Sequence, residues 1–502
     1  MINEGIELDV YNEISEFALN WYRDENGTDL YENEGVSVGQ LISCAAVVFF
    51  ASIYREYYYF KDNYSADKPI TYNEQEHPIR LLIARKLSNN FRIDNYIPAS
   101  GEVLDRKHGA VPAYRKASNY ISYIQYPIIP FLKNRKLYLS DWTFSMLEKK
   151  NVKKDIFTNS INIFKGAYLR YSENYIKYAE KYLPSSLDEN KIKNSLISRS
   201  KMLSLFLPDE LISLFCDYIM LYYKQNRAYF ISVIALYEEL IVRYKPHSVV
   251  FPGELYEPYI LIRSICKLRK VKTIFMIDGF PLFVYYPHFK DKHNCNYCFD
   301  QFISFGIGMD NDFLTKKIDQ QQIIKQKWPV FERYDYIERK QGVYDCIIMT
   351  WIPLNTNPHA SLDRQNEILE NVLILAKSKG YSKIAIKIKG AVEKKYVLPL
   401  IENEPSIVML EGPLYKHLKK AKMIIGGVSS AIAEARYCDV PYYIYEPIHN
   451  GYPDSLLFNS SILSREIVAR NIDELENNIK TNMSVMNIDK TFIIHNPSKK
   501  NE

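Results

Sequence analysis

Short apolar runs alternate with segments of helical periodicity over the C-terminal part of the chain. The apolar runs are rich in Ile, Val and Tyr, and they predict strands at residues 344–351, 383–388, 406–410, 423–425 and 441–445. Apolar residues at helical spacing predict helices at residues 362–379, 393–401, 413–420, 430–437 and 472–479. Strands that alternate with helices build a parallel sheet, so we expect residues 341–485 to form a Rossmann-like domain, followed by a tail at residues 486–502.

A second strand–helix–strand pattern lies further upstream. Strands are predicted at residues 247–254 and 272–279, with a helix at residues 256–270 between them. Glu254 ends the first strand and Asp278 the second, and the carboxyl ends of parallel strands meet at one edge of a sheet. Two carboxylates at such an edge suit acid–base or nucleophilic catalysis at a sugar carbon. The alternative is that Asp278 caps a turn while Glu254 faces water.

The first 245 residues show helical patterns without regular strand–helix alternation. The apolar run at residues 41–54 stops at Arg55, short of the ~20 residues that span a bilayer, and it predicts a buried helix. The fold class expected is therefore α/β, with two Rossmann-like domains facing a cleft. Residues 1–340 would form the first domain, with a helical elaboration at 1–245 and a Rossmann-like core at about 246–340, and residues 341–485 the second.

The turn at residues 426–430 is the clearest candidate for ligand binding. Two glycines follow the predicted strand at 423–425 and permit a tight backbone turn. Ser429 and Ser430 come next, at the start of a predicted helix, where N–H groups and hydroxyls can bind a phosphate. The alternative is that these serines only cap the helix.

Other predicted strands of the same sheet also end in candidate ligand-binding residues. Thr350 and Trp351 end the strand at 344–351, and a Gly412-Pro413 pair follows the strand at 406–410. Lys387 and Lys389 alternate along one strand, so both side chains are expected on the same face, where a phosphate or carboxylate could bind. The alternative is that these lysines are solvated.

Composition bounds the class of protein. The chain has 502 residues, of which 47% are hydrophobic and 25% charged, as expected for a soluble globular protein with more than one core. The net charge is +5 and the basic residues are spread along the chain, which argues against nucleic-acid binding. Seven cysteines are scattered apart from the pair Cys295 and Cys298, and a structural zinc site needs four ligands. We expect a cytoplasmic protein with free thiols.

Two short basic runs bear on membrane contact. Lysines cluster at residues 149–154 and 416–422, and such runs can favour an anionic membrane surface. The first residues are acidic rather than basic, so no secretion signal is expected. Peripheral contact with the inner membrane is therefore an expectation, and the alternative is that these lysines lie on solvated helix faces.

The motif at residues 426–435, Gly-Gly-Val-Ser-Ser-Ala-Ile-Ala-Glu-Ala, and the strand after Pro441 resemble the nucleotide-sugar domain of GT-B glycosyltransferases. The paired serines resemble those of bacterial enzymes that use CMP-activated acidic sugars, namely sialyltransferases and the retaining Kdo transferases of surface-polysaccharide assembly. The Asp278-Gly segment resembles that of the Kdo transferases. This resemblance covers about residues 245–450 and implies transfer of Kdo or a nonulosonic acid from CMP to a bacterial surface glycan, such as lipopolysaccharide, O-antigen or capsule.

The resemblance also implies roles for individual residues. Asp278 would be the nucleophile of a retaining reaction and Glu254 its acid–base partner. Ser429 and Ser430 would hold the donor phosphate. The cytidine pocket would be lined by Thr350, Gly412 and Pro413. The other residues expected on the donor side are Trp351, Lys387, Lys389 and Glu434.

One departure from the family keeps other functions open. Related enzymes usually carry a His-Pro pair after the second strand of the nucleotide domain, where this chain has Ile388-Lys389-Gly390. Lys389 could take over the electrostatic role of that histidine. The alternatives are a UDP- or GDP-sugar transferase, a CDP-glycerol-type polymerase, or a non-catalytic protein of polysaccharide assembly. We expect no cofactor and no metal, because no Asp-x-Asp cluster stands at a strand end.

Overall fold

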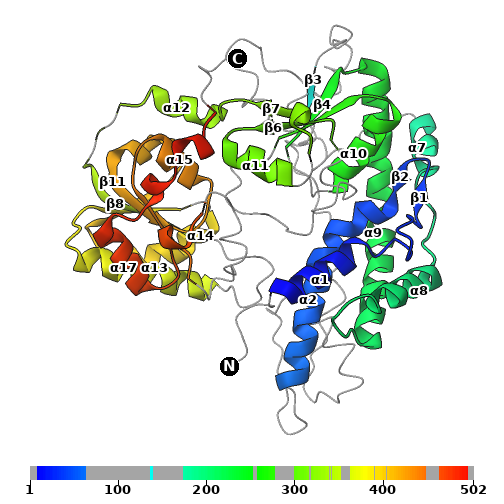
Figure 1. Ribbon diagram of the computed structural model, residues 1–502, viewed down its shortest axis with the longest axis horizontal. Coiled ribbons are helices and arrows are strands. Elements are labelled where there is room, and N and C mark those ends of the chain that lie inside the picture. Colours follow the sequence, from blue (N-terminus) through cyan, green and yellow to red (C-terminus); the bar gives the residue numbers. More distant parts are fainter. Residues whose placement is uncertain are drawn as a thin grey trace. The chain divides into compact units, whose positions relative to one another are not determined.

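The computed structural model describes residues 8–63, 136–139, 173–252, 257–276, 299–315, 318–338, 340, 342–351, 362–388, 391–402, 404–447 and 463–495 (Figure 1). The chain divides into two compact units. One contains residues 9–144 and 150–274, and the other contains residues 1–8, 145–149 and 275–502. The domain limits expected from the sequence stay a prediction.

The first unit is mainly helical. Its longest element is α9 (Asp209–Tyr244), which begins after Pro208 and ends where Lys245 adopts a left-handed conformation. Four of the described helices pack on α9. A short hairpin of β1 (Glu32–Asn33) and β2 (Val36–Ser37) follows α1 (Leu8–Leu19). The four helices that pack on α9 are α2 (Val38–Asn63), α7 (Glu173–Glu180), α8 (Glu189–Ser200) and α10 (Glu257–Leu268).

Aromatic residues and an ion pair with a buried glutamate hold these helices together. The rings of Phe17 and Phe50 lie 5.0 Å apart, and the ring of Phe215 lies 4.5 Å from that of Phe50, so α1, α2 and α9 share one core. Glu238 of α9 is buried and accepts a hydrogen bond from Arg269, just after α10. Burial of a carboxylate is costly without such a partner, and the hydrogen bond from Arg269 offsets this cost for Glu238.

A five-stranded sheet has the order β3-β4-β5-β6-β7. Its strands are β3 (Lys136–Tyr138), β4 (Ser248–Phe251), β5 (Lys272–Phe275), β6 (Gln301–Ser304) and β7 (Ile323–Lys325). Since β4 and β5 are neighbours joined through α10, the strand–helix–strand unit expected at residues 247–279 is confirmed. The helix α11 (Ile307–Thr315) follows β6. Glu254 and Asp278, predicted to end the strands of this unit, lie outside the described residues.

The C-terminal sheet has six strands in the order β10-β9-β8-β11-β12-β13, and every neighbouring pair is parallel. Numbered along the chain this is 3-2-1-4-5-6, the doubly wound order, so the direction of winding reverses between β8 and β11. The strands are β8 (Tyr344–Met349), β9 (Ile384–Lys387), β10 (Ile407–Leu410), β11 (Ala421–Gly426), β12 (Tyr442–Tyr445) and β13 (Val468–Ala469). The helices are α13 (Leu362–Ser378), α14 (Ala391–Ile401), α15 (Ala431–Tyr437) and α17 (Ile472–Thr481).

The predicted fold class, α/β with two largely parallel sheets and a helical N-terminal elaboration, is confirmed for the described residues. One predicted element is wrong. Residues 413–420 form two short 3-10 helices, η6 (Leu414–Lys416) and η7 (Leu418–Lys420), instead of one helix. His417, with φ near −118°, interrupts the helical path between them, and only ten residues connect β10 to β11.

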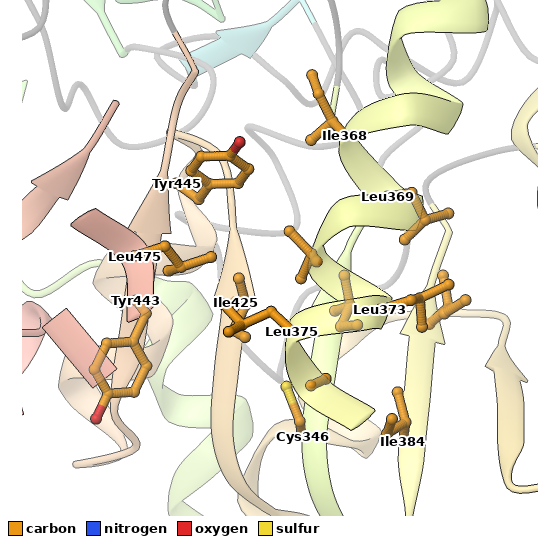
Figure 2. Close-up of a cluster of buried hydrophobic side chains, with 14 of the residues drawn as sticks. Cys346, Ile368, Leu369, Leu373, Leu375, Ile384, Ile425, Tyr443, Tyr445 and Leu475 are labelled. Atoms are coloured by element: carbon orange, nitrogen blue, oxygen red, sulfur yellow. The ribbon is translucent and has the colours of Figure 1, made fainter. Parts of the chain in front are cut away.

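A cluster of buried apolar side chains fixes the C-terminal sheet (Figure 2). Ile368, Leu369 and Leu373 of α13 pack toward Cys346 of β8 and Ile384 of β9, and all five are largely or fully buried. Each such side chain contributes about 1.5–3 kcal/mol when it leaves water. The close packing makes the strands a rigid base for the segments that follow them.

The described residues also bear on membrane crossing and on the state of the cysteines. None of the helices that the structure describes is both long and apolar enough to cross a membrane. Cys346 and Cys438 are free and buried, which agrees with the expected free thiols, and Cys216 and Cys266 are buried as well. Cys295 and Cys298 lie outside the described part of the chain.

Asp345, near the amino end of β8, predicts a pH effect on stability. Its Oδ1 lies 2.7 Å from Lys422 Nζ, and its Oδ2 accepts hydrogen bonds from the backbone of Ser382 and Lys383. The bond from Lys422 is the main cause that lowers the pKa of Asp345 to about 2 from 3.8. A lowered carboxyl pKa stabilises the fold above pH 3.8, and this contribution is lost as the pH falls through about 2.

Asp345→Asn is therefore expected to flatten the dependence of unfolding free energy on pH between about 4 and 2, by about 1 kcal/mol after allowance for solvent screening of Lys422. Urea unfolding at several pH values measures this. Equal slopes in the two proteins would contradict the assignment.

Candidate functional site

The candidate site lies at the switch point of the C-terminal sheet, where β8 and β11 are neighbours. Open α/β sheets bind ligands beyond the carboxyl ends of their strands at such a point. Thr350 and Trp351 follow β8, and Gly426 to Ser430 end and follow β11; we call residues 426–430 the glycine turn. Because the strands are parallel, these segments share one edge of the sheet with the ends of β9 and β12.

The two glycines of the glycine turn are required by close packing. A Cβ atom on Gly426 would lie 2.7 Å from Met349 Cβ. A Cβ atom on Gly427 would lie 2.6 Å from Trp351 Cδ1 and 2.7 Å from Glu446 Oε2. Neither space can hold a methyl group without displacement of its neighbours. The turn therefore sits directly on the side chains that follow β8 and β12.

Trp351 forms the base of the glycine turn. The side chain is only 2% exposed, and its Nε1 donates a hydrogen bond of 2.6 Å to the carbonyl of Tyr445 at the end of β12. The indole thus extends from the end of β8 to the end of β12, and its Cδ1 lies directly beside Gly427. The sequence predicted contact between Trp351 and a donor, whereas the structure places the side chain beneath the turn.

Glu446, the residue after β12, is a part of the site that sequence reasoning missed. It is 1% exposed, and its Oε2 accepts a hydrogen bond of 2.8 Å from the backbone N–H of Val428 in the glycine turn. Its carbonyl accepts a hydrogen bond from the buried Arg470. A glutamate at the carboxyl end of a predicted strand was the available signal.

Ser429 and Ser430 complete the glycine turn. Both residues are partly exposed, but the Oγ atom of Ser429 is itself buried. Ser430 occupies the N-cap position of α15, but its hydroxyl makes no capping hydrogen bond. The carbonyls of both serines accept hydrogen bonds from the first turns of α15. Capping by its hydroxyl therefore does not explain Ser430 at this position.

Thr350 and Lys387 are brought together at the ends of neighbouring strands. The backbone N–H and the Oγ1 of Thr350 donate to the carbonyl of Lys387, at 3.2 and 3.3 Å. Lys387 is 6% exposed, and its Nζ donates to the carbonyl of Ile388. The structure thus places a buried lysine two strands away from the glycine turn, in the order β9-β8-β11. Lys389 lies outside the described residues.

Gly412 and Pro413 follow β10 at the far side of β9. Gly412 has a φ of +80°, a left-handed conformation that favours glycine, and both residues are exposed.

His417 was not among the predicted residues, yet its Nε2 lies 3.3 Å from the carbonyl of Glu411 in this turn. Burial lowers the pKa of His417, the hydrogen bond with the Glu411 carbonyl opposes that shift, and the charges of Lys420, Lys387 and Lys416 lower the pKa further.

Glu434 points to a different part of the protein. Its carboxyl group is buried in α15 and accepts a hydrogen bond from Tyr334 of α12 (Glu332–Asp335). Burial raises the pKa of Glu434, although Tyr334 and Arg333 oppose that shift. The rings of Phe331 and Tyr437 stack 4.3 Å apart beside this pair. The structure therefore places Glu434 in the packing of α15 on the segment before β8.

Of the basic run at residues 416–422, which suggested membrane contact, Lys419 and Lys422 have partners within the protein, and the run at residues 149–154 lies outside the described residues. Lys419 Nζ donates to the carbonyls of Tyr334 and Ile337, and Lys422 pairs with Asp345. Across the described ranges, no group of three or more His, Cys, Asp or Glu side chains could hold a metal ion.

No family model and no curated protein matches the chain. Solved structures with partial similarity include UDP-GlcNAc 2-epimerase from Neisseria meningitidis bound to UDP-GlcNAc, at 10% identity and a TM-score of 0.38 over 62% of this chain and 80% of that one. UDP-GlcNAc 2-epimerase from Methanocaldococcus jannaschii with UDP-GlcNAc and UDP has 13% identity and a TM-score of 0.36 over 64% and 85%. A glycosyltransferase from Rickettsia africae has 15% identity and a TM-score of 0.30 over 52% and 72%. At these values the similarities establish neither a family nor an activity.

Proposed function

We propose that this protein is a cytoplasmic glycosyltransferase of the GT-B type that binds a nucleotide sugar at the switch point of its C-terminal sheet. The observation that carries the proposal is the sheet order, which brings Thr350 and the glycine turn to one edge between β8 and β11. Ligands of doubly wound sheets bind at this position. Ser430 has a hydroxyl there that does not cap its helix.

The donor proposed is a CMP-activated ulosonic acid, Kdo or a nonulosonic acid. In this arrangement Ser429 and Ser430 bind the phosphate, and Lys387 supplies positive charge from the end of β9. Thr350 and the Gly412-Pro413 turn line the cytidine pocket. The acceptor is a bacterial surface glycan, and the enzyme contacts the inner membrane peripherally.

Transfer uses the two acids that follow β4 and β5 in the sequence. An oxygen of Asp278 bonds to the anomeric carbon while the bond from that carbon to the phosphate oxygen breaks, and CMP leaves with the electron pair. The acceptor hydroxyl then displaces Asp278, and Glu254 takes up the proton of that hydroxyl. The configuration of the sugar is retained, and neither a cofactor nor a metal takes part.

A nucleotide panel tests this proposal. We expect CMP to raise the melting temperature by about 3 °C or more at saturating concentration, with smaller shifts for UDP and GDP. Ser430→Ala should weaken CMP binding about tenfold, because one hydrogen bond to a charged group is lost. Ser378→Ala is the matched control, since that hydroxyl donates to the carbonyl of Leu375 within α13.

The proposal fails if no cytidine nucleotide stabilises the protein. Strong stabilisation by UDP or GDP alone would favour the alternative donors. With a CMP-sugar and no acceptor, intact-protein mass spectrometry should detect a glycosyl adduct that is absent from Asp278→Ala.

A further inference from the structure

The peptide between Gly427 and Val428 is held at both ends by side chains of β12 and the residue after it. Its carbonyl oxygen accepts a hydrogen bond of 2.7 Å from the hydroxyl of Tyr442, the first residue of β12. Its N–H donates a hydrogen bond of 2.8 Å to Oε2 of Glu446, the residue that follows β12. Because a peptide is planar, partners at both ends fix the direction in which it points.

Tyr442 contacts the glycine turn from inside the sheet. Its side chain is fully buried, and its hydroxyl also lies against Gly426, where an added Cβ atom would collide with it. Burial raises the pKa of Tyr442, and the nearby Ser429 hydroxyl only partly opposes that shift, so the phenol keeps its proton at neutral pH. Tyr442 donates that proton to the Gly427 carbonyl, which therefore points into the protein.

A peptide that follows two glycines is easily reversed. Glycine restricts the backbone less than any other residue, so the turn by itself has several conformations of similar energy. Reversal of this peptide would direct the Gly427 carbonyl, with its partial negative charge, away from Tyr442. Anions bind to turns whose N–H groups, and not their carbonyls, point at them. A turn that is already held in one conformation also loses less conformational entropy when a ligand binds.

We propose that Tyr442 is a positioning residue for the donor phosphate. Its hydroxyl holds the peptide between Gly427 and Val428, so the glycine turn has the conformation that binds phosphate before the nucleotide sugar arrives. Tyr442 acts through the turn and does not contact the donor, because its side chain is buried. This inference rests on the proposed binding of a nucleotide sugar at the switch point.

Tyr442→Phe tests this role, because it removes the hydroxyl and keeps the ring. Isothermal titration should show CMP binding about tenfold weaker than in the wild type, as expected when a hydrogen bond that shapes the site is lost. Equal affinity in Tyr442→Phe and the wild type would overturn the positioning role and leave the proposed function intact.

Tyr443→Phe is the matched control. Tyr443 is the next residue of β12 and is also buried, but its side chain packs in the cluster of Figure 2 and its hydroxyl donates to Asn482 Oδ1, 3.4 Å away. Both variants should lower the melting temperature, because each loses a hydroxyl that makes a hydrogen bond. Only Tyr442→Phe should lose affinity for CMP. An equal loss of affinity in Tyr443→Phe would show a general effect of destabilisation and overturn the proposal.

The double variant with Ser430→Ala separates positioning from support of the fold. Ser430→Ala alone should weaken CMP binding about tenfold. In the Tyr442→Phe background the same substitution should weaken it only about twofold, because the Ser430 hydroxyl is no longer held where it meets the phosphate. Tenfold weakening in both backgrounds would overturn the proposal, since independent residues have effects that multiply.

Hydrogen exchange at residues 426–430, followed by mass spectrometry, tests the hold on the turn without any nucleotide. Exchange should be faster in Tyr442→Phe than in Tyr443→Phe, because the released turn samples other conformations. Equal exchange in the two variants would overturn the proposed hold. Failure of every nucleotide to bind the wild type would instead overturn the proposed function, and the positioning of phosphate with it.

Discussion

Gly427→Ala is expected to abolish nucleotide binding and to lower the free energy of unfolding by about 3 kcal/mol. The new methyl group would lie 2.6 Å from Trp351 Cδ1 and 2.7 Å from Glu446 Oε2. Both neighbours are buried and engaged in hydrogen bonds, so the backbone of the glycine turn must move instead. Urea unfolding gives the loss of stability, and titration with CMP gives the loss of binding.

Gly380→Ala is the control for this substitution. Gly380 follows α13 with a φ of +75°, and a Cβ there would have nothing within 4 Å. The cost should be about 1 kcal/mol, from the backbone conformation alone, and CMP binding should not change. If Gly427→Ala were as stable as Gly380→Ala and still bound CMP, the close contact of the turn with Trp351 would not matter for function.

Trp351→Ala is expected to destabilise the protein by about 4 kcal/mol, the range for removal of a buried aromatic side chain. The indole fills the space beneath Gly427, and its Nε1 satisfies the carbonyl of Tyr445. Loss of the side chain leaves a cavity and an unpaired carbonyl under the turn. Urea unfolding measures the destabilisation, and a large rise in the dissociation constant for CMP should accompany it.

Trp351→Phe helps to separate the two effects, because it removes the hydrogen bond but keeps much of the apolar volume. We expect it to cost about 2 kcal/mol. Ile374→Ala serves as the control in α13, since Ile374 is 66% exposed and its loss should change stability by less than about 0.5 kcal/mol. A Trp351→Ala protein as stable as Ile374→Ala would show that the indole does not support the turn.

The local pattern of apolar residues was sufficient to predict the main elements of the C-terminal sheet. The apolar runs at residues 344–351, 383–388, 406–410 and 441–445 contain β8, β9, β10 and β12. A strand buried on both faces must be apolar along its length, so its position is visible in a short window of sequence. β13 was missed because two residues, Val468 and Ala469, make no recognisable pattern.

The predicted helix at residues 413–420 shows the limit of such patterns. The segment has suitable residues, but the short connection between β10 and β11 leaves it as two separate turns around His417. Propensity is a weak prior, and the path that the chain must follow between strands overrides it. The site residues show the same limit: Glu434 follows the serines in the sequence but packs against Tyr334.

The sequence by itself determined the α/β class, the succession of strands and the presence of glycines and serines after β11, because each of these depends on neighbours within a few residues. The tertiary structure alone decided which strand ends meet. The reversal of winding between β8 and β11 joins Thr350 to the glycine turn across about 75 residues of chain. It also placed Trp351 beneath Gly427 and Glu446 against Val428, since contacts between distant segments depend on how close-packed side chains fill the space between strands.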